Sequence, residues 1–258
     1  MKRYVTNLSV VLPCLNESKT IEICILKAFE SIKKLQIAGE VIVADNGSID
    51  GSQTLAKNLG ARVIKVEQKG YGAALRAGIA DAKFEFIVIA DSDDTYALDN
   101  LMPFIEQLEL GAQLVIGNRF KGGIEKSAMP FLHKYLGVPV LSLIGKLLFE
   151  VPINDFHCGL RAFEKKAITN LGLKCVGMEF ASEIIIKAAK ANLKITEVPT
   201  TLRPNFKDRK PHLRTWRDGW RHLTLLIKFG YGRILFFTRV FLIITFCHCL
   251  LILIQSIS

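Results

Sequence analysis

The chain has 258 residues, half of them hydrophobic, which suffices for one large α/β domain with a full core. Its formal net charge is +10, but the basic residues crowd the stretch 203–239, and residues 1–200 carry neither a basic stripe nor a nucleic-acid-binding motif. We therefore expect no nucleic acid partner. The six cysteines form no C-x-x-C pair, which disfavours a zinc site or a disulfide framework and favours reduced, mostly buried thiols.

Short apolar runs alternate with segments of helical periodicity up to residue 117. The runs predict strands at Leu8–Pro13, Glu40–Ala44, Arg62–Val66, Phe86–Ala90 and Leu114–Gly117. The segments between them predict helices at Thr20–Leu35, Ser52–Leu59, Gly72–Ala82 and Leu98–Leu110. This alternation is typical of βαβ units and of a largely parallel sheet covered on both faces.

The pattern loosens after Asn118. The next elements are predicted as helices at Phe131–Phe149 and Phe180–Ala191, strand-like pieces at Asp155–Phe163 and Ile195–Val198, and a basic loop at Thr200–Leu213. The stretch Arg214–Phe229 is amphipathic, because Trp216, Trp220, Leu223 and Ile227 recur at helical spacing. We expect this helix to lie in the plane of a membrane interface.

Residues 234–257 are nearly all apolar and form a candidate transmembrane helix. At 1.5 Å per residue they would span roughly 36 Å, against a hydrocarbon core of about 30 Å. A buried core helix is the alternative. The basic residues before the segment favour a cytoplasmic location for its N-terminal side. The short polar segment Met1–Asn7 lacks the features of a signal peptide. We therefore expect a catalytic domain on the cytoplasmic face of a membrane.

Polar clusters follow the predicted strands, at Asn16-Glu17, Asp45-Asn46, Lys69-Gly70 and Asp91-Ser92-Asp93. In open α/β sheets ligands bind beyond the carboxyl ends of the strands, so these clusters predict one shared site. Asp91 and Asp93 can both reach a hard divalent cation, Mg²⁺ or Mn²⁺, which would stabilise a diphosphate leaving group. The alternative is a turn cluster that caps the helix predicted near Leu98.

The segment Lys69–Ala74 places two glycines at the start of a helix. The third glycine of a dinucleotide-binding loop is absent, because Leu75 occupies its place, and no Walker motif occurs anywhere in the chain. Both of these cofactor interpretations are therefore rejected. Glycines at a helix start still let backbone N–H groups approach an anionic ligand.

Five segments together resemble the family-2 inverting glycosyltransferases with a GT-A fold, and most closely the dolichyl- and polyprenyl-phosphate sugar synthases. They are LSVVLPCLNE (Leu8–Glu17), VADNGSIDGS (Val43–Ser52), KGYGAA (Lys69–Ala74), DSDDTY (Asp91–Tyr96) and GNRF (Gly117–Phe120). The resemblance covers roughly residues 5–230. It implies a GT-A fold for the α/β domain, which we expect over residues 1–213. The amphipathic helix over 214–233 and the candidate membrane helix over 234–257 follow it.

The resemblance also implies roles for single residues in binding the nucleotide-sugar donor. The nucleoside pocket would be lined by Pro13, Leu15 and Glu17, the base contacted by Asp45 and Asn46, and the ribose approached by Lys69 and Gly70. Many relatives carry two aspartates where this chain has Asp45 and Asn46, which leaves open whether the donor is a UDP-sugar or GDP-mannose.

Catalytic and metal-binding roles follow from the same resemblance. Asp91 and Asp93 would hold the metal and the diphosphate, Arg119 would contact phosphate, and Thr95 stands where some relatives have a glutamine metal ligand. Glu183 matches a carboxylate position of the family. A surface charge on its helix is the alternative for Glu183.

The loop Arg209–Arg214 resembles a basic acceptor loop of the lipid-phosphate enzymes. There Arg209, Lys210, His212 and Arg214 would bind the acceptor phosphate, although a polybasic segment beside a membrane is a compatible alternative. The function implied is metal-dependent transfer of a hexose to a polyprenyl phosphate. A growing glycan as acceptor, or a membrane-tethered protein that binds nucleotide sugar without turnover, are the alternatives.

Overall fold

A computed structural model of the chain describes residues 4–206, 214, 216–233 and 235. Its centre is a seven-stranded sheet in the order β3-β2-β1-β4-β6-β5-β7. The strands are β1 (Asn7–Cys14), β2 (Ala38–Asp45), β3 (Arg62–Lys65), β4 (Phe86–Ile89), β5 (Leu114–Asn118), β6 (Arg161–Glu164) and β7 (Ile195–Pro199). Only β6 runs antiparallel to its neighbours, so the mostly parallel α/β sheet is confirmed.

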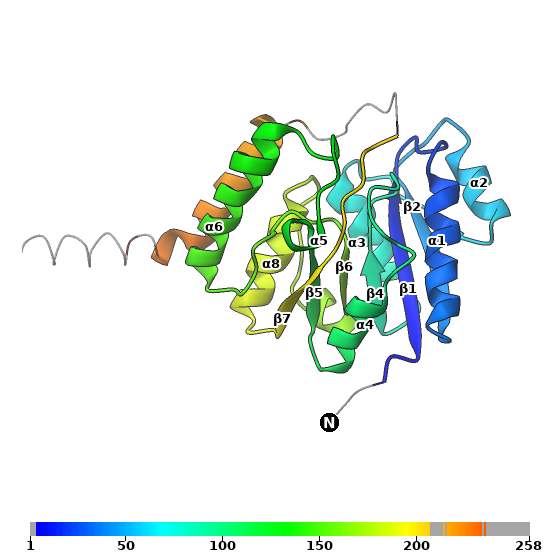
Figure 1. The fold of residues 1–258 in the computed structure, drawn as a ribbon, viewed down its shortest axis with the longest axis horizontal. Coiled ribbons are helices and arrows are strands. Elements are labelled where there is room, and N and C mark those ends of the chain that lie inside the picture. Colours follow the sequence, from blue (N-terminus) through cyan, green and yellow to red (C-terminus); the bar gives the residue numbers. More distant parts are fainter. Residues whose placement is uncertain (1–3, 207–213, 215, 234, 236–258) are drawn as a thin grey trace, which may run out of the picture.

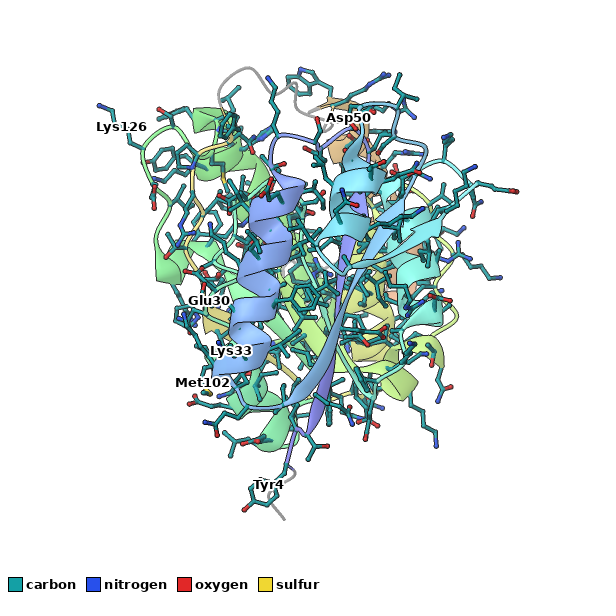
Figure 2. All side chains as sticks on the ribbon, turned by 90° about the vertical axis from the view of Figure 1, so that its right-hand side faces the viewer. Tyr4, Glu30, Lys33, Asp50, Met102 and Lys126 are labelled. Atoms are coloured by element: carbon teal, nitrogen blue, oxygen red, sulfur yellow. The ribbon has the colours of Figure 1, made fainter. Side chains whose placement is uncertain are left out.

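Helices cover both faces of this sheet (Figure 1). They are α1 (Ile21–Lys34), α2 (Ser52–Asn58), α3 (Tyr71–Asp81), α4 (Met102–Glu109), α5 (Arg119–Gly122), α6 (Val138–Phe149), α7 (Lys165–Thr169) and α8 (Phe180–Lys190). In Figure 2, Glu30 and Lys33 of α1 lie on the same side of the sheet as Met102 of α4. The helix α3 packs on the other side, where Gly78 comes so close to Val11 that a Cβ there would lie 2.3 Å from its Cγ1.

The register of β1 and β2 sets the position of the site. Val10 pairs with Val41 and Leu12 with Val43, so Cys14 at the end of β1 lies opposite Asp45 at the end of β2. Both strands are buried along these residues, which explains their continuous apolar runs. The carboxyl ends of the parallel strands therefore meet at one edge, which is the upper edge in Figure 2, where Asp50 lies, with Tyr4 at the lower end.

Three predicted elements differ in extent from the observed ones. The helix expected at Leu98–Leu110 begins only at Met102, with a proline in its first turn, where the missing N–H costs no hydrogen bond. The helix expected at Phe131–Phe149 is divided into a π-helical turn, η1 (His133–Gly137), and α6. Pro139 has no N–H for the carbonyl four residues earlier, so a regular helix cannot run through this point.

The third is the strand piece expected at Asp155–Phe163. Only its end forms β6, because Asp155 and the residues after it form a turn that binds Arg119. Among the described cysteines Cys14, Cys24 and Cys158 are buried free thiols, and burial raises the pKa of the Cys14 thiol to about 11. Their burial agrees with the expectation of mostly buried thiols.

A helix over residues 216–233 follows the sheet domain. It contacts the domain through a face that contains Asp218, His222 and Leu226, all buried. Among the described residues no helix is long and apolar enough to cross a membrane. The candidate membrane helix at 234–257, and the loop positions Arg209, Lys210 and His212, lie outside the described residues.

Candidate functional site

The loop after β4 is tied to the end of β1 by side chain to backbone hydrogen bonds. The Ser92 hydroxyl donates to the Pro13 carbonyl at 2.6 Å, and the Thr20 hydroxyl donates to the Ser92 carbonyl at 2.7 Å. Glu17 lies between them and is buried, and its backbone N–H donates to Ser52 at the start of α2. Two of the predicted polar clusters, Asn16-Glu17 and Asp91-Ser92-Asp93, therefore come together at one edge of the sheet.

The two aspartates of the D-x-D motif are both held in place. Asp91 accepts a hydrogen bond from the Tyr71 hydroxyl at 2.8 Å. A Cβ on Gly159 would lie 2.6 Å from Asp91 Oδ2, so only glycine leaves room for this carboxylate. Asp93 Oδ1 accepts from the backbone N–H of Thr95 and, at 2.6 Å, from its hydroxyl. Thr95 thus orients Asp93 in this structure.

These carboxylates fit a divalent cation whose other ligands come from its substrate. Among the residues described, no three His, Cys, Asp or Glu side chains gather in a metal-binding arrangement. Magnesium and manganese sites in such enzymes typically use one or two carboxylates together with phosphate oxygens and water. An open cavity of about 350 Å³ is lined by Asp93 and Asp94 and by Pro204, Asn205 and Phe206.

The end of β2 holds the neighbouring loops through Asp45 and Asn46. Asp45 is fully buried and accepts hydrogen bonds from two backbone N–H groups of its own loop and from the Gln53 side chain at 2.6 Å. The Asn46 amide donates to the carbonyls of Val66 and Gln68 and accepts from the Gly70 N–H at 2.7 Å. A carboxylate could not donate these two hydrogen bonds, so the structure explains why an amide stands at position 46.

The loop that carries Lys69 and Gly70 is anchored from both sides. The Lys69 ammonium donates to the Asn46 carbonyl at 2.6 Å. Gly70 has a φ of 132°, and a Cβ there would lie 2.1 Å from the Val176 carbonyl oxygen, so this position requires glycine. Leu15, the remaining residue of the predicted nucleoside pocket, is half-buried after β1. The predicted donor-binding residues are therefore brought to one region, and their contacts with a nucleotide stay predictions.

Glu183 is not a surface charge on its helix. It is buried in α8 and accepts hydrogen bonds from the backbone N–H groups of Lys174 and Cys175, and it forms an ion pair with Lys187 at 2.8 Å. Burial opposes ionisation, but these donors together hold the pKa of Glu183 below its ordinary value. The alternative that the sequence left open is therefore wrong, and Glu183 shapes the loop that covers Gly70 and Gly72.

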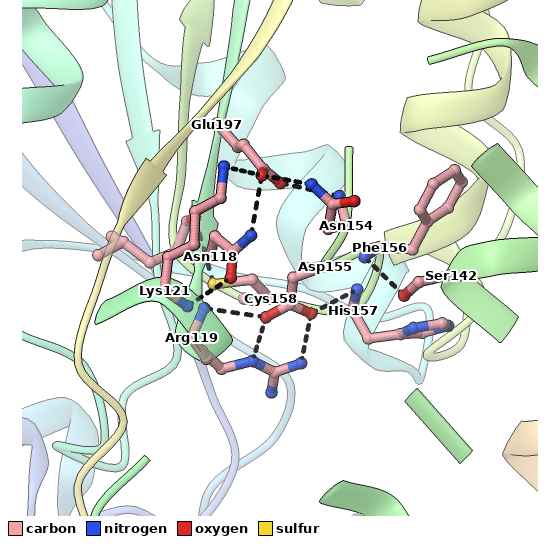
Figure 3. A network of polar contacts seen from close by, with 12 residues as sticks. Asn118, Arg119, Lys121, Ser142, Asn154, Asp155, Phe156, His157, Cys158 and Glu197 are labelled. Carbon is pink, nitrogen blue, oxygen red and sulfur yellow. Dashed lines mark hydrogen bonds and ion pairs between the residues drawn. The ribbon is translucent and has the colours of Figure 1, made fainter. Parts of the chain in front are cut away.

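Arg119 forms a buried two-point ion pair with Asp155 (Figure 3). Its Nε and Nη2 each lie 2.7 Å from an oxygen of Asp155, and its backbone N–H donates to the same carboxylate. Beside this pair Glu197 binds Asn118, Lys121 and Asn154. Asp155 was missed in the sequence, where an acidic residue in an irregular segment gives no signal of its distant partner.

The helix over 216–233 is attached to α8 close to the loop that contains Lys174 and Cys175. His222 Nδ1 lies 2.8 Å from the Ser182 hydroxyl, and the His222 ring contacts the ring of His157 edge-on, with centroids 4.5 Å apart. Arg221 pairs with Glu179 at 3.6 Å. Arg214, which the sequence assigns to the acceptor loop, is exposed, and its backbone N–H donates to Asp218.

Comparison with known proteins gives concordant results. The sequence model of the family "Glycosyl transferase family 2" matches residues 9–172. A "Low-salt glycan biosynthesis hexosyltransferase" of Haloferax volcanii is 35% identical over 221 residues, which are 85% of this chain and 53% of that protein. A "Dolichyl-phosphate hexose transferase" of the same organism is 27% identical over 79% of this chain and 86% of its own length. The chain thus spans about half the length of the first of these relatives.

Solved structures show the same fold. Glucosyl-3-phosphoglycerate synthase from Mycobacterium tuberculosis, in complex with Mn²⁺, UDP and glucosyl-3-phosphoglycerate, superposes with a TM-score of 0.67 at 23% sequence identity. The superposition covers 87% of this chain and 80% of the other. The same protein is also described in complex with Mg²⁺ and UDP. This likeness establishes the GT-A architecture of the sheet domain.

Proposed function

The chain belongs to glycosyltransferase family 2, and on that premise we propose that it transfers a hexose from a nucleotide-diphospho-sugar to a polyprenyl phosphate. The acceptor lipid would be dolichyl or undecaprenyl phosphate, and the domain would work on the cytoplasmic face of a membrane. The observation that carries the proposal is the position of Asp91 and Asp93 beside the ends of β1 and β2. The relatives named as dolichyl-phosphate transferases support the acceptor.

A divalent cation, Mg²⁺ or Mn²⁺, would be held by Asp91 and Asp93 and would stabilise the negative charge of the departing diphosphate. The loops that Asp45 and Asn46 hold would form the wall of the nucleoside pocket. Tyr71 and Thr95 would keep the two carboxylates oriented towards the diphosphate while the sugar bond breaks.

The reaction would be a single displacement with inversion at the anomeric carbon. An oxygen of the acceptor phosphate forms a new bond to the anomeric carbon while the bond between that carbon and the diphosphate oxygen breaks. The nucleoside diphosphate leaves with the electron pair of the broken bond. A lipid phosphate is already anionic near neutral pH, so the step needs no general base. It does need cations that bring two anions together. Arg214 and the loop residues Arg209, Lys210 and His212 would supply them, and Arg119 would join them through the part of its guanidinium that Asp155 does not bind.

The test has two parts. Nucleoside diphosphates and Mn²⁺ or Mg²⁺ are first compared by thermal shift, since a ligand at a hundred times its Kd stabilises a protein by about 2.7 kcal/mol. The full chain is then incubated with the stabilising nucleotide's sugar and with polyprenyl phosphate in detergent, and lipid-linked sugar is extracted. A parallel reaction contains a glycan acceptor, and sugar that appears only on that glycan would contradict the lipid acceptor. Nucleotide binding without any turnover would indicate a protein that binds nucleotide sugar without transferring it.

A further inference from the structure

Exposed large hydrophobic side chains concentrate on two segments that the active-site argument does not use. Among the described residues twenty such side chains are exposed, and twelve of them lie within 131–147 and 216–235. Single exposed apolar residues are normal on a protein surface, whereas a cluster marks an interaction site. The clustering therefore needs an explanation of its own.

Each segment carries its apolar side chains along one helical stripe. On η1 and α6 the stripe consists of Leu132, Leu136, Val140, Leu143 and Leu147, and on the helix over 216–233 it consists of Trp216, Trp220, Ile227 and Tyr231. The spacings of three, four and seven residues place each set on one helix face. The opposite faces, with Ser142, Gly145 and Leu148 on α6 and with His222 and Leu226 on the other helix, are buried against the domain. Both stripes therefore point away from the protein body.

The two helices lie side by side at the left edge of the molecule in Figure 1. A Cβ on Gly230 would come within 2.8 Å of Leu148, so the helices touch there without room for a larger side chain. Arg233 pairs with Glu150 at 2.9 Å, which joins the C-terminal ends of both helices. The two helices thus form one outer layer with two outward stripes. At 1.5 Å per residue the stripe on η1 and α6 is about 22 Å long.

This layer is also strongly basic. Residues 131–150 and 214–233 together contain seven basic and two acidic side chains: Lys134, Lys146, Arg214, Arg217, Arg221, Lys228, Arg233, Glu150 and Asp218. Of the acids, Glu150 is paired with Arg233 and Asp218 is buried. Apolar stripes flanked by arginine and lysine complement a surface that offers both acyl chains and negative headgroups.

We propose that α6 with η1 and the helix over 216–233 form one docking surface for an anionic lipid bilayer, with both stripes in the headgroup and acyl boundary. The inference rests on the proposed transfer to a lipid phosphate and deepens it, because it names the surface that brings the domain to its acceptor. The positive charge favours a bilayer over a second copy of this chain, whose matching surface would carry the same charge. Both tryptophans of the chain lie on the stripe, where membrane-interface aromatics are common.

Depth-dependent fluorescence quenching tests this surface residue by residue in the full chain. Trp216→Phe and Trp220→Phe together remove the native tryptophans, and one tryptophan is then introduced by Leu143→Trp on α6. The matched control is Leu26→Trp on α1, at the other edge of the molecule, where Leu26 is 51% exposed compared with 55% for Leu143. Each variant is mixed with vesicles of phosphatidylglycerol whose acyl chains are brominated near the glycerol.

We expect Leu143→Trp to shift its emission to the blue and to lose most of its intensity, while Leu26→Trp stays unchanged. The native tryptophans should behave like Leu143→Trp, and high salt or zwitterionic vesicles should weaken the quenching. Equal quenching of Leu143→Trp and Leu26→Trp, or none for either, would overturn the proposal. A blue-shifted emission of Leu143→Trp without vesicles would also overturn it, because the stripe would then already be covered. A shift that depends on protein concentration would identify a second copy as the cover, and a shift that does not would identify another part of the chain.

The proposed function and the proposed docking surface can be tested independently. Formation of lipid-linked sugar in detergent micelles does not require a bilayer, so product without quenching at Leu143→Trp would refute only the docking surface. Quenching without any lipid-linked product would refute only the acceptor.

Discussion

The edge of the sheet formed by β1, β2 and β4 and the flank formed by β5, β6, α6 and the helix over 216–233 are stabilised in different ways. At the edge, short loops bind backbone groups of neighbouring loops through small polar side chains such as Asn46 and Ser92. The flank depends on buried contacts between two side chains, such as Arg119 with Asp155 and Ser182 with His222. The donor side is therefore built from polar motifs at the strand ends that bind backbone groups, and the proposed acceptor side from side-chain pairs outside such motifs.

The largest expected effect comes from breaking the flank at Asp155. Asp155→Ala leaves the buried Arg119 guanidinium without its partner, and removal of one member of a buried pair typically costs about 3–5 kcal/mol. Denaturant unfolding should show this loss. Asp155→Asn, which keeps the shape, should cost less, and Asp81→Asn at an exposed ion pair should cost little. Equal stability of Asp155→Ala and the parent would show that the pair does not hold the flank.

The edge should respond in activity rather than in stability. Asp93→Asn retains the size of the side chain and an oxygen for Thr95 but removes one charge from the proposed cation site. We expect a folded protein whose turnover is lower by about a hundredfold or more, by analogy with the loss of one charge-stabilising group elsewhere. Asp81→Asn again serves as the control. Undiminished turnover of Asp93→Asn, or full activity in a chelator, would contradict the metal site.

A smaller effect would test whether Asn46 is needed as an amide. Asn46→Asp keeps the shape but replaces two donated hydrogen bonds with a carboxylate facing the carbonyl oxygens of Val66 and Gln68. An unsatisfied buried polar group costs about 1–3 kcal/mol, so thermal stability should fall. Because the acid adds repulsion, Asn46→Asp should be less stable than Asn46→Ala. The opposite order would mean that the carbonyls find other donors.

The difference between the two regions also explains how far the sequence could be interpreted. The clusters at Asp45, Lys69 and Asp91 each begin at the last residue of a strand or within four residues after it, so strand order brings them together. Asp155 and His222 have partners thirty-six and forty residues away, and no spacing rule connects such pairs. Glu183 was left open for the same reason, since the backbone N–H groups that bind it lie in a preceding loop without regular structure. The exposed stripe on α6 could not be told from a core stripe, because periodicity marks an apolar face and not what covers it.

The last expected effect concerns pH and the attachment of the helix over 216–233. The pKa of His222 is lowered to about 4, against an ordinary value of 6.5, because burial and the nearby charges of Arg161 and Arg221 outweigh the opposing effect of Asp218. The unfolded chain therefore binds a proton at His222 between about pH 6.5 and 4 while the folded chain does not. This contribution to stability is present above pH 6.5 and is lost as the pH falls towards 4.

At pH 5 the loss from His222 should be on the order of 1–2 kcal/mol, since each pKa unit corresponds to 1.36 kcal/mol. His157 is buried beside it and has its pKa lowered in the same direction, so the two contributions add. His222→Gln removes one titrating group and retains an amide within reach of Ser182, and it should therefore flatten the dependence of stability on pH in this range. Denaturant unfolding of the parent and of His222→Gln at pH 7.5 and pH 5 measures the difference. If both proteins lose the same stability on acidification, the attachment of the helix does not depend on a neutral His222, and the acid sensitivity of the flank arises elsewhere.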